Sequence, residues 1–180
     1  MKEFKVNDFI ELENVAAWQL IISPILDPKS PPYKIAPYEK SYMKMTFGEI
    51  EAHIKRRNTY FIGFDSDRNH ALLRIVDPEA RKALLNIDKE QIMLTDDAIK
   101  QLFACKNKES YQKMLDKLIA TKAEAQTMRF KWDEIDFDSM NRWKENMLAE
   151  KIEEFLPPLE PDLRQIKYYD KEPAGARWHF

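Results

Sequence analysis

The residues most suggestive of chemistry lie in one polar stretch, FDSDRNHALL, which begins at position 64. Asp65, Asp67 and Asn69 occupy alternate positions in it, as the first ligands of a calcium-binding loop do. An EF-hand loop also needs glycine at its sixth position and glutamate at its twelfth, where this chain has His70 and Val76. Aspartate, serine and asparagine also build turns by bonding to nearby backbone, so we interpret the stretch as a turn between two strands.

The same acids could serve a metal-dependent hydrolase, in which carboxylates hold a divalent ion that activates water. Asp65, Asp67 and Asp77 are the weak candidate ligands. Metal nucleases of this kind also place an acid and, two residues later, a lysine on the next strand, and the sequence ALLRIVD has no such pair. We therefore keep a metal-dependent hydrolase as a third hypothesis, and we expect no catalytic residues, no bound metal and no cofactor.

Other common sites lack their sequence signatures. The three histidines show no H-x-x-x-H or H-E-x-x-H spacing, so we expect no zinc site on a helix. The three glycines cannot form a glycine-rich phosphate loop. Cys105 is the single cysteine and falls near the end of an expected helix, where the dipole disfavours a thiolate, so we expect a small buried residue. No small-molecule substrate is evident from these patterns.

A basic run, HIKRRN, could contact the phosphates of a nucleic acid. It places Lys55, Arg56 and Arg57 at the end of an expected helix, and Arg68 follows in the polar turn. Cations at a helix C-terminus are also favoured simply by the helix dipole. The net charge of −2, from 29 basic and 31 acidic residues, gives no general attraction to nucleic acid. Nucleic-acid binding is therefore our alternative hypothesis.

Two segments carry apolar side chains where regular structure is not expected. Residues 23–40 contain five prolines, which remove amide donors and fix φ, so we predict an extended arm. The arm carries Tyr33, Ile35 and Tyr38, whereas a flexible linker would be more polar. Residues 157–180 form a C-terminal tail, and its aromatic residues are Tyr168, Tyr169, Trp178 and Phe180. Extended segments of this kind add strands to neighbours or fill their grooves, so we predict that both segments bind a protein partner.

The first 22 residues fit either a helix or a strand. A helical stripe runs through Phe9, Leu12, Ala16 and Leu20, while residues 4–12 alternate as a strand would. Further along, Thr46 and Glu49 form the pattern of a capping box at a helix start. The segments TYFIGFD and HALLRIVD read as two strands, and Asp77 is placed to cap a short helix that begins at Pro78.

From residue 95 onward the sequence reads as helical. Thr95 is placed to cap a helix over residues 96–105, and a second apolar stripe begins near Lys108 and weakens after Thr121. Ser139 is placed to cap a last long helix, which Pro157 and Pro158 end. These patterns predict an α+β fold, with a small antiparallel sheet and helices followed by a helical C-terminal portion and an extended tail.

We divide the chain into five parts: an N-terminal helix or strand (1–22), the arm (23–40), a small α+β core (41–92), a helical portion packed on that core (93–156) and the tail (157–180). The first residues show no apolar signal region, and VAAWQLIISPIL is too short to span a bilayer, so we expect a cytoplasmic protein of a cell or host cell without membrane contact.

Our leading hypothesis is a non-enzymatic interaction or assembly protein: a subunit or accessory factor that uses its extended segments to bind a protein partner or further copies of itself. A virion, phage or mobile-element protein would suit such arms, although no motif supports that origin.

Overall fold

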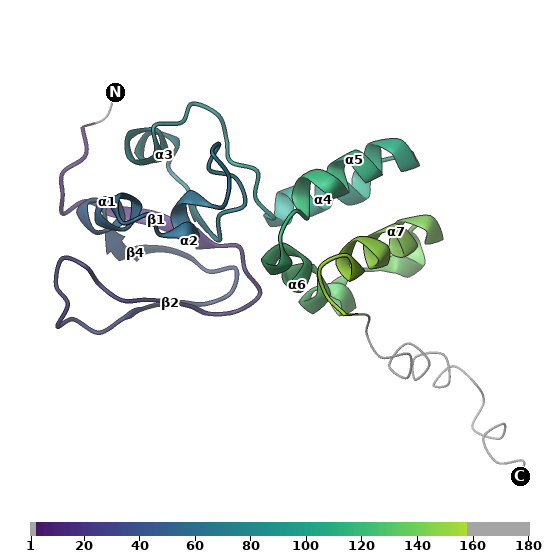
Figure 1. The fold of residues 1–180 in the computed structure, drawn as a ribbon, viewed down its shortest axis with the longest axis horizontal. Helices are drawn as coiled ribbons and strands as arrows, with labels where there is room; N and C mark the ends of the chain where they lie inside the picture. Colours follow the sequence, from purple (N-terminus) through teal and green to yellow (C-terminus); the bar gives the residue numbers. More distant parts are fainter. Residues whose placement is uncertain (1–2, 158–180) are drawn as a thin grey trace, which may run out of the picture.

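The computed structural model describes residues 3–157, and it confirms the predicted α+β fold (Figure 1). The elements of the described chain are β1 (Phe9–Asn14), β2 (Leu20–Ile22), β3 (Tyr33–Ile35), β4 (Lys40–Thr46), α1 (Phe47–Lys55), α2 (Thr59–Ile62), β5 (Leu73–Ile75), α3 (Pro78–Leu85), α4 (Asp96–Ala104), α5 (Lys108–Leu118), α6 (Lys122–Phe130), the short 3-10 helices η1 (Trp132–Glu134) and η2 (Phe137–Ser139), and α7 (Arg142–Glu153). Below, residues 3–92 are called the α/β half and residues 93–157 the helical half.

The N-terminal segment is a strand rather than a helix, and it lies at the centre of the sheet. The strand order is β4-β1-β5, and both pairs are antiparallel. Ile10 and Leu12 point into the core of the α/β half, at 3% and 0% exposure, which is the alternation expected of a half-buried strand. The helical spacing of apolar residues in this segment therefore does not determine its structure.

The predicted arm folds back on its own chain. β3 pairs with β2 in an antiparallel hairpin that lies alongside β4 in Figure 1. The side-chain amide of Asn14 holds the hairpin by donating to the backbone oxygens of Ile35 and Ala36 at 3.1 and 3.0 Å. The prolines of the segment fall outside both strands, so they cost the short ladder no hydrogen bond.

One predicted strand is wrong. TYFIGFD forms the short helix α2, because the Asn58 side chain accepts a hydrogen bond from the Tyr60 amide and caps it. Gly63 then ends the helix with φ of +65°, a backbone conformation that glycine adopts without a steric penalty. The polar stretch after it is therefore a loop between α2 and β5 and not a turn between two strands.

Most of the predicted caps are confirmed. The side chains of Thr46, Asp77 and Thr95 accept from the first-turn amides of α1, α3 and α4. The capping box at Thr46 is half formed: the Glu49 carboxylate accepts from the amides of Ile25 and Leu26 and so ties the arm to α1. Capping of the last helix by Ser139 is wrong, because Asn141 is the residue before α7.

The helical half has its own core, built from α4 to α7. The predicted long stripe belongs to two helices: α5 ends at Leu118, and a complete capping box of Thr121 and Glu124 begins α6. Tyr111 and Leu115 of α5 are fully buried against this core, together with Leu148 of α7. No helix of the described residues is long and apolar enough to cross a membrane.

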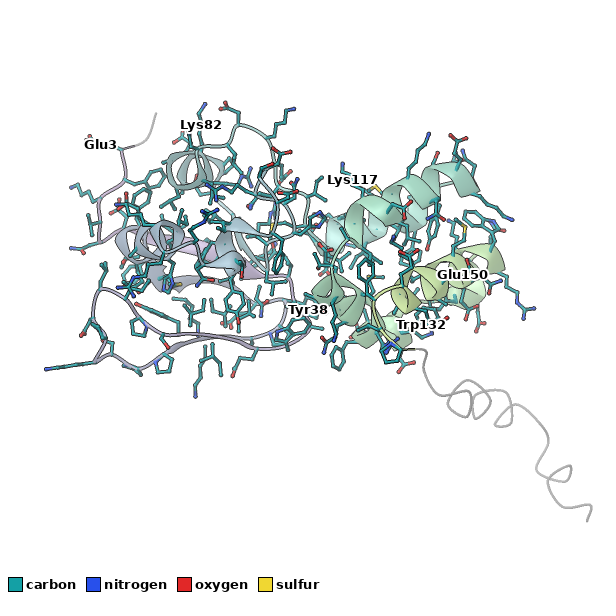
Figure 2. The ribbon with its side chains drawn as sticks, viewed as in Figure 1. Glu3, Tyr38, Lys82, Lys117, Trp132 and Glu150 are labelled. Carbon is teal, nitrogen blue, oxygen red and sulfur yellow. The ribbon has the colours of Figure 1, made fainter. Side chains whose placement is uncertain are left out.

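Polar contacts join the two halves. His70 of the α2–β5 loop lies 2.6 Å from the Glu124 carboxylate of α6, measured from Nδ1 to Oε1. The Lys131 ammonium lies 3.8 Å from the centre of the Tyr38 ring. Figure 2 places Tyr38 where the turn after the hairpin meets the helical half. The halves therefore pack through specific bonds as well as through the chain that links them.

Candidate functional site

An open groove of about 640 Å³ lies beside the first half of β1. The residues that line it are Phe4, Asp8, Phe9, Ile10, Glu11, Val76, Asp77 and Pro78. The groove exists because β5 pairs with β1 only along Leu12–Asn14, and one further bond joins the Val76 amide to the Glu11 oxygen. The chain then turns into α3 at Pro78, so no strand of the described residues continues on the β5 side of Phe9.

The open edge presents backbone groups to the groove. Along a strand, successive residues direct their N–H and C=O groups to opposite neighbours. The Phe47 amide bonds to the Asp8 oxygen on the β4 side, and the Val76 amide bonds to the Glu11 oxygen on the β5 side. The register with β4 shifts between Ile10 and Leu12, but these two positions of β1 oppose four of β4, so the extra residues lie in β4 and β1 keeps its alternation. Phe9 and Glu11 therefore direct their backbone groups to the same side, and the N–H and C=O of Phe9 and the N–H of Glu11 face the groove. These groups are the template that an added strand needs.

The groove combines apolar surface with negative charge. The Phe9 side chain is 55% exposed, and Phe4 stacks on Phe47 at a centroid distance of 5.3 Å. Asp8, Glu11 and Asp77 bring three carboxylates to the lining. The Asp8 carboxylate accepts a hydrogen bond from the Lys5 amide, while Glu11 makes no ion pair with any described residue. A segment with cationic and apolar side chains would therefore fit this surface.

One signal in the sequence could have indicated this groove. Phe9 and Ile10 are adjacent apolar residues, so one of them must point away from the core of a strand. Ile10 takes the buried face, and Phe9 is left exposed. The position at which β5 stops pairing with β1 has no comparable signal, because it is set by the turn into α3.

The predicted partner-binding residues of the arm contact their own chain. Ile35 is completely buried in the core of the α/β half, and Tyr33 packs against the same core. Burial raises the pKa of Tyr38 to about 12, with a further contribution from Glu134 and Asp96 of the helical half. Tyr168, Tyr169, Trp178 and Phe180 lie outside the described residues.

Three of the four basic candidates lie on exposed surface. Lys55, Arg56 and Arg57 are exposed at the C-terminal end of α1, where Lys55 forms an ion pair with Glu51 at 3.0 Å. Arg57 has a positive φ of 59°, so the chain reverses direction directly after the helix. Arg68 is half-buried in the α2–β5 loop, and its backbone oxygen accepts a bond from the Gln91 side chain.

The acidic candidates serve local structure. The Asp65 carboxylate accepts from the backbone and side-chain amides of Asn69 at 2.8 and 2.9 Å. Burial tends to raise the pKa of Asp65, but these hydrogen bonds outweigh it and lower the pKa. Asp77 caps α3, and Asp67 is exposed. Within residues 3–157 no group of three His, Cys, Asp or Glu side chains is placed to hold a metal ion.

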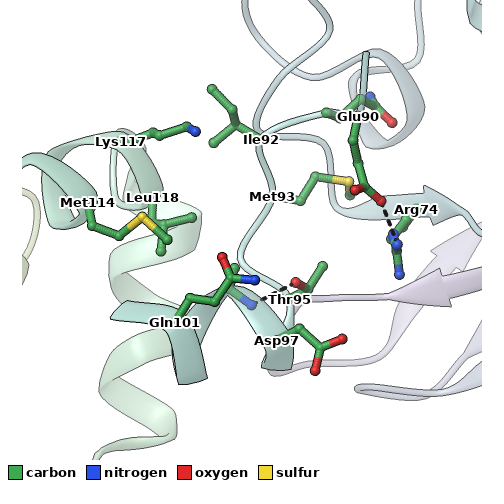
Figure 3. A pocket seen from close by; sticks show the side chains of 12 residues that line it. Arg74, Glu90, Ile92, Met93, Thr95, Asp97, Gln101, Met114, Lys117 and Leu118 are labelled. Atoms are coloured by element: carbon green, nitrogen blue, oxygen red, sulfur yellow. Dashed lines mark hydrogen bonds and ion pairs between the residues drawn. The ribbon is translucent and has the colours of Figure 1, made fainter. Parts of the chain in front are cut away.

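A second pocket, of about 330 Å³, lies between the two halves (Figure 3). Arg74 of β5 borders it, and its guanidinium bonds to Glu90 at 2.7 Å and to Glu13 at 3.0 Å. Lys117 of α5 projects toward Ile92 from the opposite side in Figure 3. Two carboxylates, Glu13 and Glu90, therefore pair with Arg74 at the edge of this pocket.

Two histidines have acidic neighbours and little contact with solvent. His53 of α1 is 5% exposed, and its Nε2 lies 3.3 Å from Glu49 Oε1 without hydrogen-bond geometry. Burial lowers the pKa of His53 by more than Glu49 raises it. The hydrogen bond to Glu124 instead raises the pKa of His70, despite burial. Cys105 is half-buried at the end of α4.

Comparisons of the chain with protein-family models, with curated proteins and with solved structures find no match. The fold and the groove therefore stand on the geometry described above.

Proposed function

We propose that this chain is a non-enzymatic protein-binding protein that captures an extended segment of a partner in the groove beside β1. The observation that carries the proposal is the open strand edge at Phe9 and Glu11. A partner can reach the backbone groups of this edge through the groove, and apolar and acidic side chains lie beside them. An added strand bonds to such an edge through its backbone, and the side-chain pockets beside the edge decide which sequences bind.

The chemistry of the groove specifies the kind of segment. The partner backbone would bond to both backbone groups of Phe9 and to the N–H of Glu11. Phe9 and Glu11 point to the same face of β1, so the segment should place an apolar residue opposite Phe9 and a cation two residues away, opposite Glu11. Exposed ion pairs contribute about 0.2–1 kcal/mol, so this pair favours a cation modestly and disfavours an acid at the same position by a similar amount.

A fluorescently labelled six-residue peptide, in which lysine and tyrosine lie two residues apart with threonine between them, is the probe that tests this proposal, because its lysine and tyrosine side chains then share one face of the strand. We expect binding to the full chain that weakens about three-fold or more in Glu11→Lys, because the lost attraction and the new repulsion are each worth about 0.2–1 kcal/mol. Glu150→Lys is the matched control, since it makes the same charge change at an exposed position of α7 and should alter binding less than two-fold.

A second form of the peptide tests the backbone bonds. N-methylation of alternate amides removes the groups that pair with a strand edge but keeps the side chains. The methylated peptide should bind at least about ten-fold more weakly. Equal binding of both peptides, or equal effects of the two charge reversals, would refute strand addition at this edge.

The alternative, nucleic-acid binding, draws support from the exposure of Lys55, Arg56 and Arg57 at the end of α1. In that case association would depend strongly on salt concentration. The groove supplies a built surface with directed backbone groups, which the basic run lacks, so we place protein binding first.

A further inference from the structure

The part of the chain beyond residue 157 contains a segment with the chemistry that the groove requires. Arg164–Tyr169, with the sequence RQIKYY, has two cations, no acid and neither proline nor glycine. It therefore suits an extended strand, whereas the last eight residues include Pro173 and Gly175. This inference rests on the proposed function, because it names the occupant of the same groove.

One antiparallel register satisfies the charges of both strands. If Ile166 lies opposite Phe9, then Arg164 lies opposite Glu11 and Lys167 lies opposite Asp8. Both cations then meet a carboxylate, and the apolar residue meets the exposed ring. Antiparallel pairing is also the arrangement of both existing neighbours of β1. Opposite charges and apolar pairs across strands each stabilise such a ladder.

The position of the chain end favours a groove on another copy. The described chain ends beside α6, where Arg129 donates to the Pro157 oxygen at 2.7 Å. The groove borders β1 and the start of α3, which belong to the α/β half, and Figure 1 shows the N terminus in that half. The six steps from Pro157 to Leu163 span at most about 20 Å. A globular chain of this size is about 40 Å across, since its radius of gyration is about 15 Å. The tail of the same molecule is therefore too short to place this segment in its own groove.

We infer that Arg164–Tyr169 of one copy adds as an antiparallel strand beside β1 of a second copy. Each molecule offers this groove and this segment at different places on the chain, so the contact either closes by reciprocal exchange between two copies or continues head-to-tail into larger rings or filaments. The chain is in this sense an assembly protein whose first partner is itself.

Two full-length variants test this inference by complementation. The tail variant carries Arg164→Glu with Lys167→Glu, and the groove variant carries Phe9→Ser with Glu11→Lys. Wild-type protein should associate increasingly with concentration in sedimentation velocity, and each variant alone should remain monomeric. An equimolar mixture should form a 1:1 dimer that grows no further, because only one groove and one segment in each pair remain functional. Thermal melting of each variant confirms that it is folded.

The outcomes separate the inference from the proposed function. A mixture that remains monomeric, or a tail variant that associates as wild type does, overturns the inference. If the wild-type chain is monomeric and binds the lysine–tyrosine probe only after its tail charges are reversed, the tail occupies its own groove and the inference fails. If the wild type is monomeric but binds the probe in a manner sensitive to Glu11→Lys, the proposed function stands and the inference alone fails. Without either association or probe binding, both fail.

Discussion

The hydrogen bond between His70 and Glu124 predicts how the contact between the two halves depends on pH. The Glu124 carboxylate accepts from His70 at 2.6 Å and, through its other oxygen, from the amides of Ala120 and Thr121 at 2.8 and 3.0 Å. The Glu124 side chain is 4% exposed and the His70 side chain 12%, so solvent screens the pair weakly. Glu124→Gln keeps the size of the side chain but removes its charge.

The sign of the effect follows from the direction of the shift. The bond to Glu124 raises the pKa of His70 in the folded state above its ordinary value of 6.5, so the folded state binds the proton more tightly than the unfolded state does. The resulting stability is fully present below pH of about 6.5 and is lost as the pH rises through the folded pKa. Burial lowers the pKa of His53, so His53 changes the stability with pH in the opposite direction. This contribution is the same in wild type and in Glu124→Gln, so it cancels when their free energies of unfolding are compared.

We therefore expect Glu124→Gln to lower the free energy of unfolding by about 1.5–3 kcal/mol at pH 6, the value of a hydrogen bond to a charged group. At pH 9 the imidazole is neutral and only its N–H bond to the carboxylate remains, so the loss should fall to about 1.5 kcal/mol, the lower end of that range. Urea denaturation of both proteins at several pH values measures the difference, and NMR titration of the His70 ring reports its pKa directly. A loss that is constant with pH, or larger at pH 9, would refute the reasoning.

Two further predictions concern the arm and the basic run. Ile35→Ala should destabilise the chain by about 2–5 kcal/mol in urea denaturation, because the side chain is completely buried in the core of the α/β half; a loss below about 1 kcal/mol would mean that the arm is not docked on its own chain. Arg56→Glu with Arg57→Glu should leave probe binding in the groove unchanged within about two-fold, because these residues do not line it. The nucleic-acid alternative would instead be favoured if a heparin column retains the wild-type protein, and if added salt and the double variant each abolish that retention.

Local sequence chemistry predicts the fold class and the caps, because a cap depends on a few adjacent residues. Thr46, Asp77 and Thr95 hold the roles that their spacing indicates. The sequence of the short helix α2 resembles a strand, because its four residues are apolar or β-branched and are too few to show a helical period. The cap from Asn58 makes them helical. The prolines of the arm exclude central strands and so suggest a free segment, yet a hairpin outside the main sheet tolerates them.

The candidate site depends on long-range geometry that the sequence does not encode locally. The groove requires that β5 leave β1 at Leu12 and that α3 begin directly afterwards. The bond from His70 to Glu124 joins residues 54 positions apart on different elements. By contrast, the apolar and cationic chemistry of the C-terminal segment is visible in the sequence itself, and the groove gives it a place to bind.

Disulfide trapping in the predicted register tests the central claim most directly. Full-length chains carrying Asp8→Cys would be mixed with chains carrying Lys167→Cys, with Cys105→Ala in both, under mild oxidation, so that the pairs of Phe9 with Ile166 and of Glu11 with Arg164 are kept. Residues directly opposite each other on paired strands bring their Cβ atoms within about 5.5 Å, close enough for a disulfide bond to form with small adjustments. We predict a disulfide-linked dimer from this mixture and at least about ten-fold less from a control mixture in which Glu172→Cys replaces Lys167→Cys. Equal trapping at both positions, or none at either, would contradict strand addition between copies.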